Sequence, residues 1–291
     1  MNKNTLQKNK KIANAIMYYI YTHIDIDIDL DELSKDLEIS KFHMHKVFKK
    51  IFGKNIYESI KSIRLQKASS LLLTNKFSSI SEVANLCGYS SHSSFIKAFK
   101  GKFNVSPKEW RNGAYKSYSN SILKASNIST KTDIDFSNIS ATIVNMPYIE
   151  SYYIRNNGYI KNVKETWQKL YTFILNNKVK KYKMAALLHD NPTVTSLDDC
   201  QYIACIITGE KEELFTKRLP KFKISDGVYA KFDIQGSSED ILRFIQWVYH
   251  DWLVDSEYET TTKPSFIIYN KNGYLEDNGL FDISYYLSIK F

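Results

Sequence analysis

The chain has 291 residues, of which 43% are hydrophobic and 24% charged, and its formal net charge is +9. This length is typical of two domains, and the apolar content is sufficient for buried cores. No stretch approaches the roughly 18 consecutive apolar residues of a membrane-spanning helix. The charged N-terminus is not followed by the apolar segment of a secretory signal. We therefore expect a cytoplasmic protein that neither spans a membrane nor is secreted.

The sequence carries no signature of a metal site or of a hydrolytic enzyme. The three cysteines, Cys87, Cys200 and Cys205, form no CxxC pair, and we expect them to be reduced thiols in the cytoplasm. Histidines and cysteines show no metal-ligand spacing, and no Gly-x-Ser-x-Gly, P-loop or zincin motif is present. We therefore expect no metal, no cofactor and no catalytic activity.

The positive charge is concentrated in the N-terminal part of the chain. Residues 1–118 contain 20 Lys and Arg against 10 Asp and Glu, whereas residues 119–291 contain 20 basic and 21 acidic residues. Such a concentration is typical of a domain that binds a polyanion such as DNA. A Lys-rich solvated surface would produce the same imbalance, so charge alone leaves both interpretations open.

Two segments of this basic part, residues 30–52 and 80–103, share the pattern of a short helix, a tight turn and a second helix. Each places a serine, Ser40 or Ser91, where it caps the second helix. Residues 6–23 are expected to form an amphipathic helix and residues 24–29 an extended connector. A helix over residues 56–73 would hold the two segments at a fixed separation, and Pro107 would open a short last helix.

In a helix-turn-helix, the second helix presents its N-terminal residues to base edges in the major groove. The helical period predicts the following outward-facing residues on the two second helices: Phe42, His45, Lys46 and Lys49, and His92, Ser93, Lys97 and Lys100. Lys can donate to guanine, Ser and His can donate or accept, and Phe can contact a thymine methyl. An exposed Phe42 is unusual on a solvated face, which favours DNA reading over a charged surface that only aids solubility.

Residues 30–111 resemble the DNA-binding domain of the AraC/XylS family of transcription regulators. The resemblance rests on the words SKFHMHKVFKKIFG, IRLQKA and ISEVANLCGYSSHSSFIKAFKGKFNVSPKEWR. It implies an all-α seven-helix domain whose two recognition helices enter adjacent major grooves about 34 Å apart. It also implies that Phe42, His45 and Lys46, with His92, Ser93 and Lys97, read bases.

The chain departs from this family pattern in two respects. Glu38 occupies a turn position that is often glycine, as Gly88 is in the second segment. Lys46 and Lys97 stand where arginine is common, so a point charge replaces a rigid two-pronged donor.

Residues 116–138 are rich in Ser, Asn, Thr and Lys, and we interpret them as a linker between domains at residues 1–115 and 139–291. After it, one order of elements occurs twice. The first occurrence consists of strand 143–155, a helix with Val163 and Ile174, and strands 184–188 and 201–207. The second consists of strand 227–234, a helix over 241–252, and strands 264–269 and 281–289. The prediction is an α+β domain built from a duplicated strand-helix-strand-strand unit, with a cleft at its pseudo-twofold axis.

This second half resembles the GyrI-like domain, which follows such a DNA-binding domain in Rob-type regulators and occurs in some multidrug sensors. The matching words are GSSEDILRFIQWVYHDWLVDSEYE and FDISYYLSIKF. The resemblance implies a cleft lined by aromatic residues for amphipathic cations or other lipophilic compounds. Many members carry a buried Glu on the last strand that pairs with the cation, where this chain has Ser284.

The candidate ligand residues fall into two groups. Asp282, Ser284 and Tyr286 share a face of the last strand by alternation, and Asp282 would supply the charge if that face is the pocket. The candidate aromatics are Trp167, Trp247 and Trp252, for which core packing is the competing interpretation.

Together these features predict a ligand-responsive transcription regulator and not an enzyme. We expect it to bind double-stranded DNA over about 20 base pairs. Two reading helices in one chain permit binding as a monomer, so dimerisation is not required. Its other expected partners are RNA polymerase and a small lipophilic or amphipathic effector. The alternative is a small-molecule-sequestering protein whose basic domain binds DNA without sequence preference.

Overall fold

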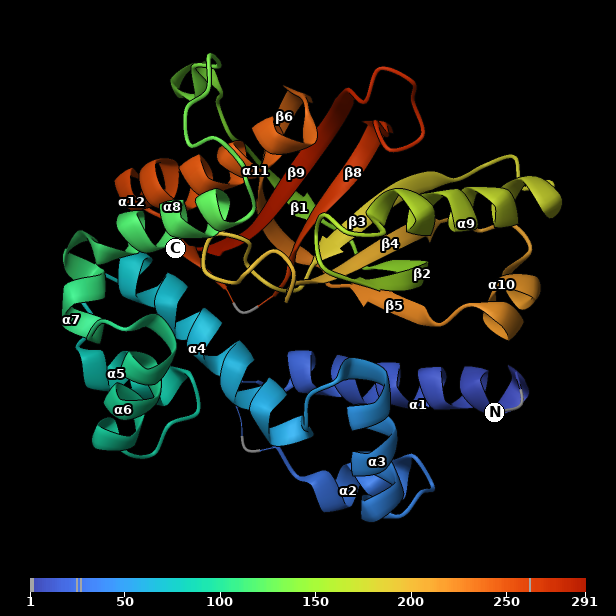
Figure 1. Cartoon of the computed structure of the whole chain (residues 1–291), viewed down its shortest axis with the longest axis horizontal. Helices are drawn as coiled ribbons and strands as arrows, with labels where there is room; N and C mark the ends of the chain where they lie inside the picture. The colour runs from blue at the N-terminus through green and yellow to red at the C-terminus, as the bar shows by residue number, and fades with distance from the viewer. Residues whose placement is uncertain (1–2, 25, 27, 262) are drawn as a thin grey trace. The chain divides into compact units, whose positions relative to one another are not determined.

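The computed structural model describes residues 3–24, 26, 28–261 and 263–291 (Figure 1). By its contacts the chain divides into two compact units, unit 1 with Met1–Ser69 and Phe77–Pro107, and unit 2 with Ser70–Lys76 and Lys108–Phe291. The division falls before the domain boundary predicted at residue 115, and residues 70–76 belong to unit 2. None of the helices in the described ranges is both long and apolar enough to cross a membrane.

Unit 1 consists of helices in the predicted order. They are α1 (Lys3–Thr22), α2 (Leu30–Asp36), α3 (Lys41–Phe52), α4 (Ile56–Thr74, which continues into unit 2), α5 (Ile80–Leu86) and α6 (His92–Phe103). Part of its core is formed by Ile16 and Ile20 of α1 with Met44 and Phe48 of α3, all fully buried. The helical period therefore identified the buried faces correctly. The extended connector expected at 24–29 includes residues 25 and 27, which lie outside the described residues.

The second helix of each helix-turn-helix segment, α3 or α6, begins and ends where its capping residues predict. The Ser40 hydroxyl accepts the backbone N–H of His43 at 3.2 Å, and the Ser91 hydroxyl accepts that of Ser94 at 3.3 Å. Helix α3 ends at Gly53 (φ 73°) and α6 at Asn104 (φ 59°), both left-handed. These caps satisfy backbone groups that a helix end otherwise leaves unpaired, so local sequence sets both ends of each helix.

The turns of both helix-turn-helix segments contain a left-handed residue. It is Glu38 (φ 51°) in the first and Gly88 (φ 73°) in the second. At Gly88 a Cβ atom would lie 2.6 Å from the guanidinium carbon of Arg64, in the part of α4 that belongs to unit 1. The left-handed backbone favours glycine there, and any Cβ atom would displace the Arg64 guanidinium, whereas Glu38 is exposed and only its backbone is strained.

Replacing Glu38 with glycine is expected to raise the free energy of unfolding by about 0.5–1 kcal/mol. Relief of the left-handed strain outweighs the extra entropy that glycine gives the unfolded chain. Urea denaturation followed by circular dichroism measures the change. The control Glu38→Ala removes the same carboxylate but keeps the Cβ atom, so equal stabilisation of both variants would show that charge, not backbone strain, is responsible.

Unit 2 begins before the domain start predicted at residue 139. Its first elements are the remainder of α7 (Pro107–Glu109), a π-helical turn (Trp110–Ala114) and α8 (Tyr115–Ala125). The predicted linker 116–138 is thus largely helical over its first ten residues, and Ile122, Leu123, Ile128 and Phe136 are buried in the unit 2 core. Its abundant Ser, Asn and Lys residues concealed an amphipathic stripe at helical spacing.

The rest of unit 2 contains the predicted duplication. The first copy is β2 (Ile149–Asn157), α9 (Val163–Asn176), β3 (Lys183–Leu188) and β4 (Gln201–Ile207), and the second is β6 (Gly227–Gly236), α11 (Ser238–Trp247), β8 (Ser265–Lys271) and β9 (Phe281–Lys290). With β1 (Thr142–Met146) and β5 (Lys221–Ile224) at its edges, the main strand order is β1-β6-β9-β8-β3-β4-β2-β5. The two copies meet where β3 pairs antiparallel with β8, with Ala186 opposite Ile267.

Some elements differ from the sequence prediction. The expected strand 143–155 is two strands, β1 (Thr142–Met146) and β2, which pair with different neighbours. They are separated at Pro147, which cannot donate a backbone N–H to a sheet. Sequence patterns also missed α10 (Glu212–Arg218), β5 (Lys221–Ile224) and β7 (Glu259–Thr260), all seven residues or shorter.

Helices α9 and α11 cover the same face of the sheet (Figure 1). We call it the helix face; it carries Ala186 of β3, Ile267 of β8 and Tyr285 of β9, which lie side by side in the strand register. Because side chains alternate along a strand, the intervening residues of the same strands point to the opposite face. After α11 the chain continues through a π-helical turn (Val248–Trp252) and α12 (Leu253–Asp255).

A buried histidine in that turn is expected to make the stability of unit 2 depend on pH. His250 is 5% exposed, and its ring packs edge-on against Tyr115 of α8 with centroids 4.8 Å apart. In the described part of the chain its Nε2 atom has no hydrogen-bond partner. Burial, helped by the charge of Lys116, lowers the pKa of His250 from 6.5 to about 3, so protonation favours the unfolded chain.

The contribution of neutral His250 to stability is therefore complete above pH 6.5 and is lost as the pH falls towards 3. We expect the free energy of unfolding to decrease by up to about 1.4 kcal/mol per pH unit from this group. Urea denaturation between pH 7 and pH 4 measures the slope. The variant His250→Gln should have a shallower slope, although buried His189, whose pKa burial also lowers, retains part of it. Equal slopes would contradict the assignment to His250.

Candidate nucleic-acid interface and ligand pocket

Helix α3 presents to solvent the residues that its period predicts. Phe42 is 78% exposed, and Lys46 and Lys49 are exposed, while the intervening Met44 and Val47 are buried. His45 is half-buried. A solvent-exposed aromatic beside two lysines matches the mixture of apolar contacts and donors that reads base edges.

Sequence patterns did not predict the residue that orients His45. Its imidazole stacks on the ring of Tyr57, with centroids 5.7 Å apart and planes inclined by 30°. Tyr57 lies in the first turn of α4 and is 59% exposed. A single aromatic at a helix start has no periodic signal, and only the tertiary structure brings the two rings together. The stacking restricts the rotamers of His45 before any ligand binds.

Helix α6 has a smaller and more polar outer face. Its exposed residues include His92, Ser93, Lys97 and Lys100. On the inner side Phe95, Phe99 and Phe103 pack in sequence, with consecutive ring centroids 5.6 and 4.5 Å apart. Its capping residue Ser91, like Ser40 of α3, uses its hydroxyl for the helix end.

The lysines of both outer faces are available to an anionic partner. Among the described residues Lys46, Lys49, Lys97 and Lys100 form no ion pair, whereas Lys41 pairs with Asp31 at 2.9 Å. Exposed, unneutralised ammonium groups on two helices of one compact unit give the electrostatic pattern that phosphate and guanine contacts require.

Unit 2 contains a pocket of about 280 Å³ on the helix face of the sheet. Its walls come from the segment after α8, the turn before α9, helix α11, the central strands and the β8–β9 loop. The lining residues are Ser126, Ile128, Tyr159, Ile160, Leu188, Tyr202, Ser238, Glu239, Ile241, Leu242, Ile245, Ile267, Tyr269, Tyr274, Phe281 and Ile283. The size and the mostly apolar walls suit a small organic molecule.

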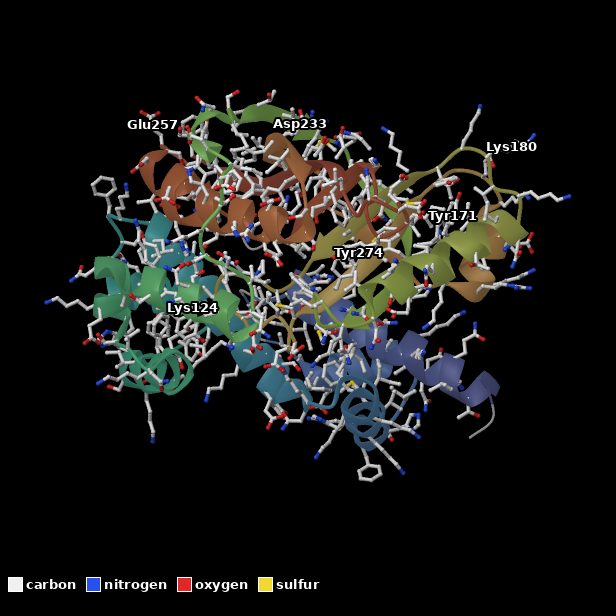
Figure 2. All side chains as sticks on the ribbon, turned by 45° about the horizontal axis from the view of Figure 1, so that its top comes forward. Lys124, Tyr171, Lys180, Asp233, Glu257 and Tyr274 are labelled. Atoms are coloured by element: carbon white, nitrogen blue, oxygen red, sulfur yellow. The ribbon has the colours of Figure 1, made fainter. Side chains whose placement is uncertain are left out.

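This pocket lies on the face opposite to the one proposed from the sequence. Phe281 and Ile283 of β9 line it, so the alternate residues Asp282, Ser284 and Tyr286 point away from it. Ser284 donates to Asp233 at 2.5 Å (Asp233 is labelled in Figure 2), and Tyr286 stacks on Phe266. Alternation grouped the three residues correctly, but it could not tell which face α9 and α11 would cover.

The three predicted tryptophans also do not line this pocket. Trp167 is fully buried beneath it, where its indole N–H donates to the Tyr202 hydroxyl at 2.8 Å. Trp247 stacks on Phe244, and Trp252 packs edge-on against Phe232. For all three, the contacts match the core-packing interpretation.

Tyrosine hydroxyls supply most of the polarity inside the pocket. Tyr159 donates to the backbone carbonyl of Asp190 at 2.7 Å, and the hydroxyls of Tyr202 and Tyr269 lie 2.8 Å apart. Burial raises the pKa of Tyr202 well above 10 and that of Tyr274, in the β8–β9 loop (Figure 2), to about 12. The phenols are therefore neutral donors and acceptors at physiological pH.

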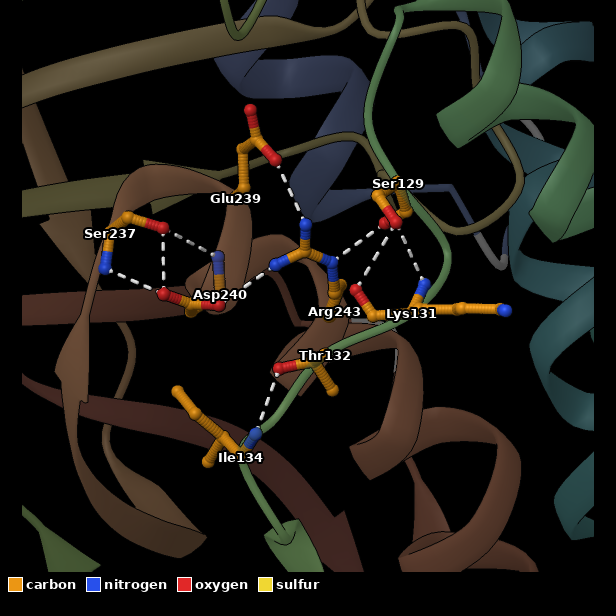
Figure 3. A network of polar contacts seen from close by, with 8 residues as sticks. All are labelled: Ser129, Lys131, Thr132, Ile134, Ser237, Glu239, Asp240 and Arg243. Carbon is orange, nitrogen blue, oxygen red and sulfur yellow. Dashed lines mark hydrogen bonds and ion pairs between the residues drawn. The ribbon is translucent and has the colours of Figure 1, made fainter.

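A buried guanidinium holds one wall of the pocket together (Figure 3). Arg243 of α11 donates to Glu239 and Asp240, both at 2.8 Å, and to the backbone carbonyl of Ser129 at 2.7 Å. The last bond ties α11 to the segment that supplies Ser126 and Ile128 to the pocket. Because the bond to Ser129 joins residues 114 positions apart, local sequence patterns could not reveal it.

Comparison with known proteins matches the two parts of the chain to two families. Residues 33–113 match the family described as a helix-turn-helix domain, and residues 140–290 match the GyrI-like small molecule binding domain. The second match spans more than half of the 291 residues.

Two curated relatives each match about a third of this chain. The xylose operon regulatory protein of Escherichia coli K12 is 36% identical over 95 residues, which are 33% of this chain and 24% of that protein. The Msm operon regulatory protein of Streptococcus mutans is 32% identical over 102 residues, 35% of this chain and 36% of that protein. The chain thus spans about a quarter and about a third of the length of these curated relatives.

Among solved structures, the C-terminal domain of AraT, a response regulator from Geobacillus stearothermophilus, is 28% identical, with a TM-score of 0.33, over 35% of this chain and 84% of that one. Both resemblances expected from the sequence are confirmed by the family matches. The chain belongs to the GyrI-like family and carries an AraC-type helix-turn-helix domain before its GyrI-like domain.

Proposed function

We propose that the chain is a sequence-specific DNA-binding transcription regulator whose activity responds to a small molecule bound by its GyrI-like domain. The observation that carries this proposal is the pair of exposed faces on α3 and α6, each with two lysines free of ion pairs among the described residues. Each helix begins at a serine cap and buries an apolar row of side chains. The opposite face is left exposed, as a recognition helix in the major groove requires. The residues proposed to contact DNA are those predicted from the sequence.

The two helices are unequal readers in this proposal. Phe42 and the oriented His45 give α3 an apolar contact and a directed hydrogen-bonding group, whereas α6 offers Ser93 and His92 on a smaller face. The first helix would therefore supply most of the base specificity. Two readers in one chain support monomeric binding to an asymmetric site of about 20 base pairs. The proposed partner on DNA is RNA polymerase, and the proposed compartment is the cytoplasm.

Selection of preferred duplexes from a random pool, followed by binding assays, tests this function. Lys46→Ala and Lys97→Ala should each weaken binding to the selected duplex by about 1–3 kcal/mol and reduce the salt dependence of that binding. The matched control is Lys124→Ala on α8, an exposed lysine outside both reading faces. Normal binding by both variants would contradict the assigned outer faces.

The alternative, a sequestering protein with only non-specific DNA binding, makes a different prediction. A regulator should favour its selected site over bulk DNA by ~10³-fold or more at physiological salt. Equal affinity for all duplexes would contradict the regulator function and support the alternative.

A further inference from the structure

The pocket of unit 2 has almost no net charge to offer a ligand. Among the described lining residues only Glu239 is formally charged at neutral pH, and its carboxylate accepts from Arg243 at 2.8 Å. The deeper walls are aliphatic residues, Phe281 and tyrosines. A cation placed there would lose its hydration without meeting a free carboxylate, which is costly in an apolar site.

A directed chain of hydrogen bonds ends in this pocket. An indole N–H can only donate, so the Tyr202 oxygen is the acceptor of the Trp167 bond at 2.8 Å. Among the described residues the Tyr269 oxygen, also at 2.8 Å, is the one acceptor within reach of the Tyr202 hydroxyl, so we assign Tyr202 as the donor of this bond. In the described part of the chain Tyr269 has no other hydrogen-bond partner. Its own proton therefore remains available to a molecule in the pocket that Tyr269 lines.

We propose that this pocket binds an uncharged, largely apolar small molecule with a carbonyl or ether oxygen, which accepts a hydrogen bond from the Tyr269 hydroxyl. The inference rests on the proposed effector-binding function and specifies its ligand class. The Trp167–Tyr202–Tyr269 chain orients the Tyr269 hydroxyl before the ligand binds. A ligand without an acceptor would leave this buried donor without a hydrogen bond, which disfavours the binding of such a ligand. Ser284 and Asp282, on the opposite face, take no part in this recognition.

Two fluorescent probes of nearly equal size separate charge from hydrogen bonding. We would use 10-methylacridone, which is neutral and has a ring carbonyl, and 10-methylacridinium, which is a cation without one, with the full-length protein. The neutral probe should bind at least about ten-fold more tightly, because the pocket offers a donor and no free carboxylate. Tighter binding of the cation, or binding of neither probe, would overturn the proposal.

Removing the donor locates the contact. Tyr269→Phe should weaken 10-methylacridone about five- to ten-fold and leave the cation unchanged. The matched control Tyr286→Phe removes a hydroxyl from the opposite face of the same sheet, outside the pocket, and it should bind like the wild type. An equal loss in both variants, or no loss in Tyr269→Phe while its circular dichroism is native, would overturn the assignment.

The DNA assay keeps this inference distinct from the proposed function. If the protein prefers the selected duplex but binds the cation more tightly, or binds neither probe, only the proposed ligand class is overturned. Equal affinity for all duplexes would overturn the regulator function, whichever probe binds.

Discussion

Replacing Arg64 with alanine is expected to lower the free energy of unfolding by about 3 kcal/mol and to weaken specific DNA binding. Its guanidinium donates to the carbonyls of Ile24 (3.3 Å) and Ile26 (2.9 Å), which precede α2, and to that of Gly88 (2.9 Å) in the second turn. One side chain of α4 thereby holds the entry to the first helix-turn-helix and the turn of the second. Without it, the separation of the two reading helices is less well defined.

Urea denaturation and binding to the selected duplex measure the two effects. Arg64→Lys is the informative second variant, because a lysine keeps the charge but cannot donate to three carbonyls in a fixed fork. Arg64→Lys should keep the wild-type salt dependence of DNA binding but not the wild-type stability. If Arg64→Lys were as stable as the wild type, charge and not geometry would be the contribution of Arg64.

A double-mutant cycle with Gly88→Ala tests the close contact itself. In the wild type the new methyl group would collide with the guanidinium and also strain a left-handed backbone. With Arg64 already replaced by alanine, only the backbone strain remains, so Gly88→Ala should cost less. Additive effects would show that the two residues do not touch in solution.

The second large effect is expected for Arg243→Met, which should lower the free energy of unfolding by about 2–3 kcal/mol. The Arg243 side chain is 10% exposed and pairs with Asp240 and Glu239, whose side chains are 20% and 49% exposed. Removal of one partner from a buried ion pair leaves the other charge uncompensated, at a typical cost of about 3–5 kcal/mol. We lower this value because Glu239 is half exposed to water.

The same variant should weaken ligand binding, because Arg243 also holds the Ser129 carbonyl of the segment that carries Ile128 into the pocket. Titration with 10-methylacridone measures that effect and urea denaturation the stability. The control Glu239→Gln removes only the half-exposed partner and should cost at most about 1 kcal/mol. Equal losses in the two variants would show that the bonds to Asp240 and Ser129 contribute little.

Much of unit 1 could be predicted because its signals are local. A helix repeats every 3.6 residues, so the buried Met44 and Phe48 and the exposed Phe42 and Lys46 follow from spacing within one element. Serine caps and left-handed ends involve residues only three or four positions apart. The duplicated strand order of unit 2 was visible for the same reason. The DNA-contacting role of these faces remains a prediction until it is measured.

Local sequence patterns predicted the helices of unit 1 with their caps and exposed faces, and the repeat in the second half. Tertiary structure alone decided which face of β9 borders the pocket, since Asp282 and Ile283 alternate regardless of where α9 and α11 pack. It also decided that residues 115–125 form a helix of unit 2, and that Arg64, Arg243 and Tyr269 meet partners between 24 and 114 residues away. Those contacts depend on long-range packing, for which a one-dimensional period carries no information.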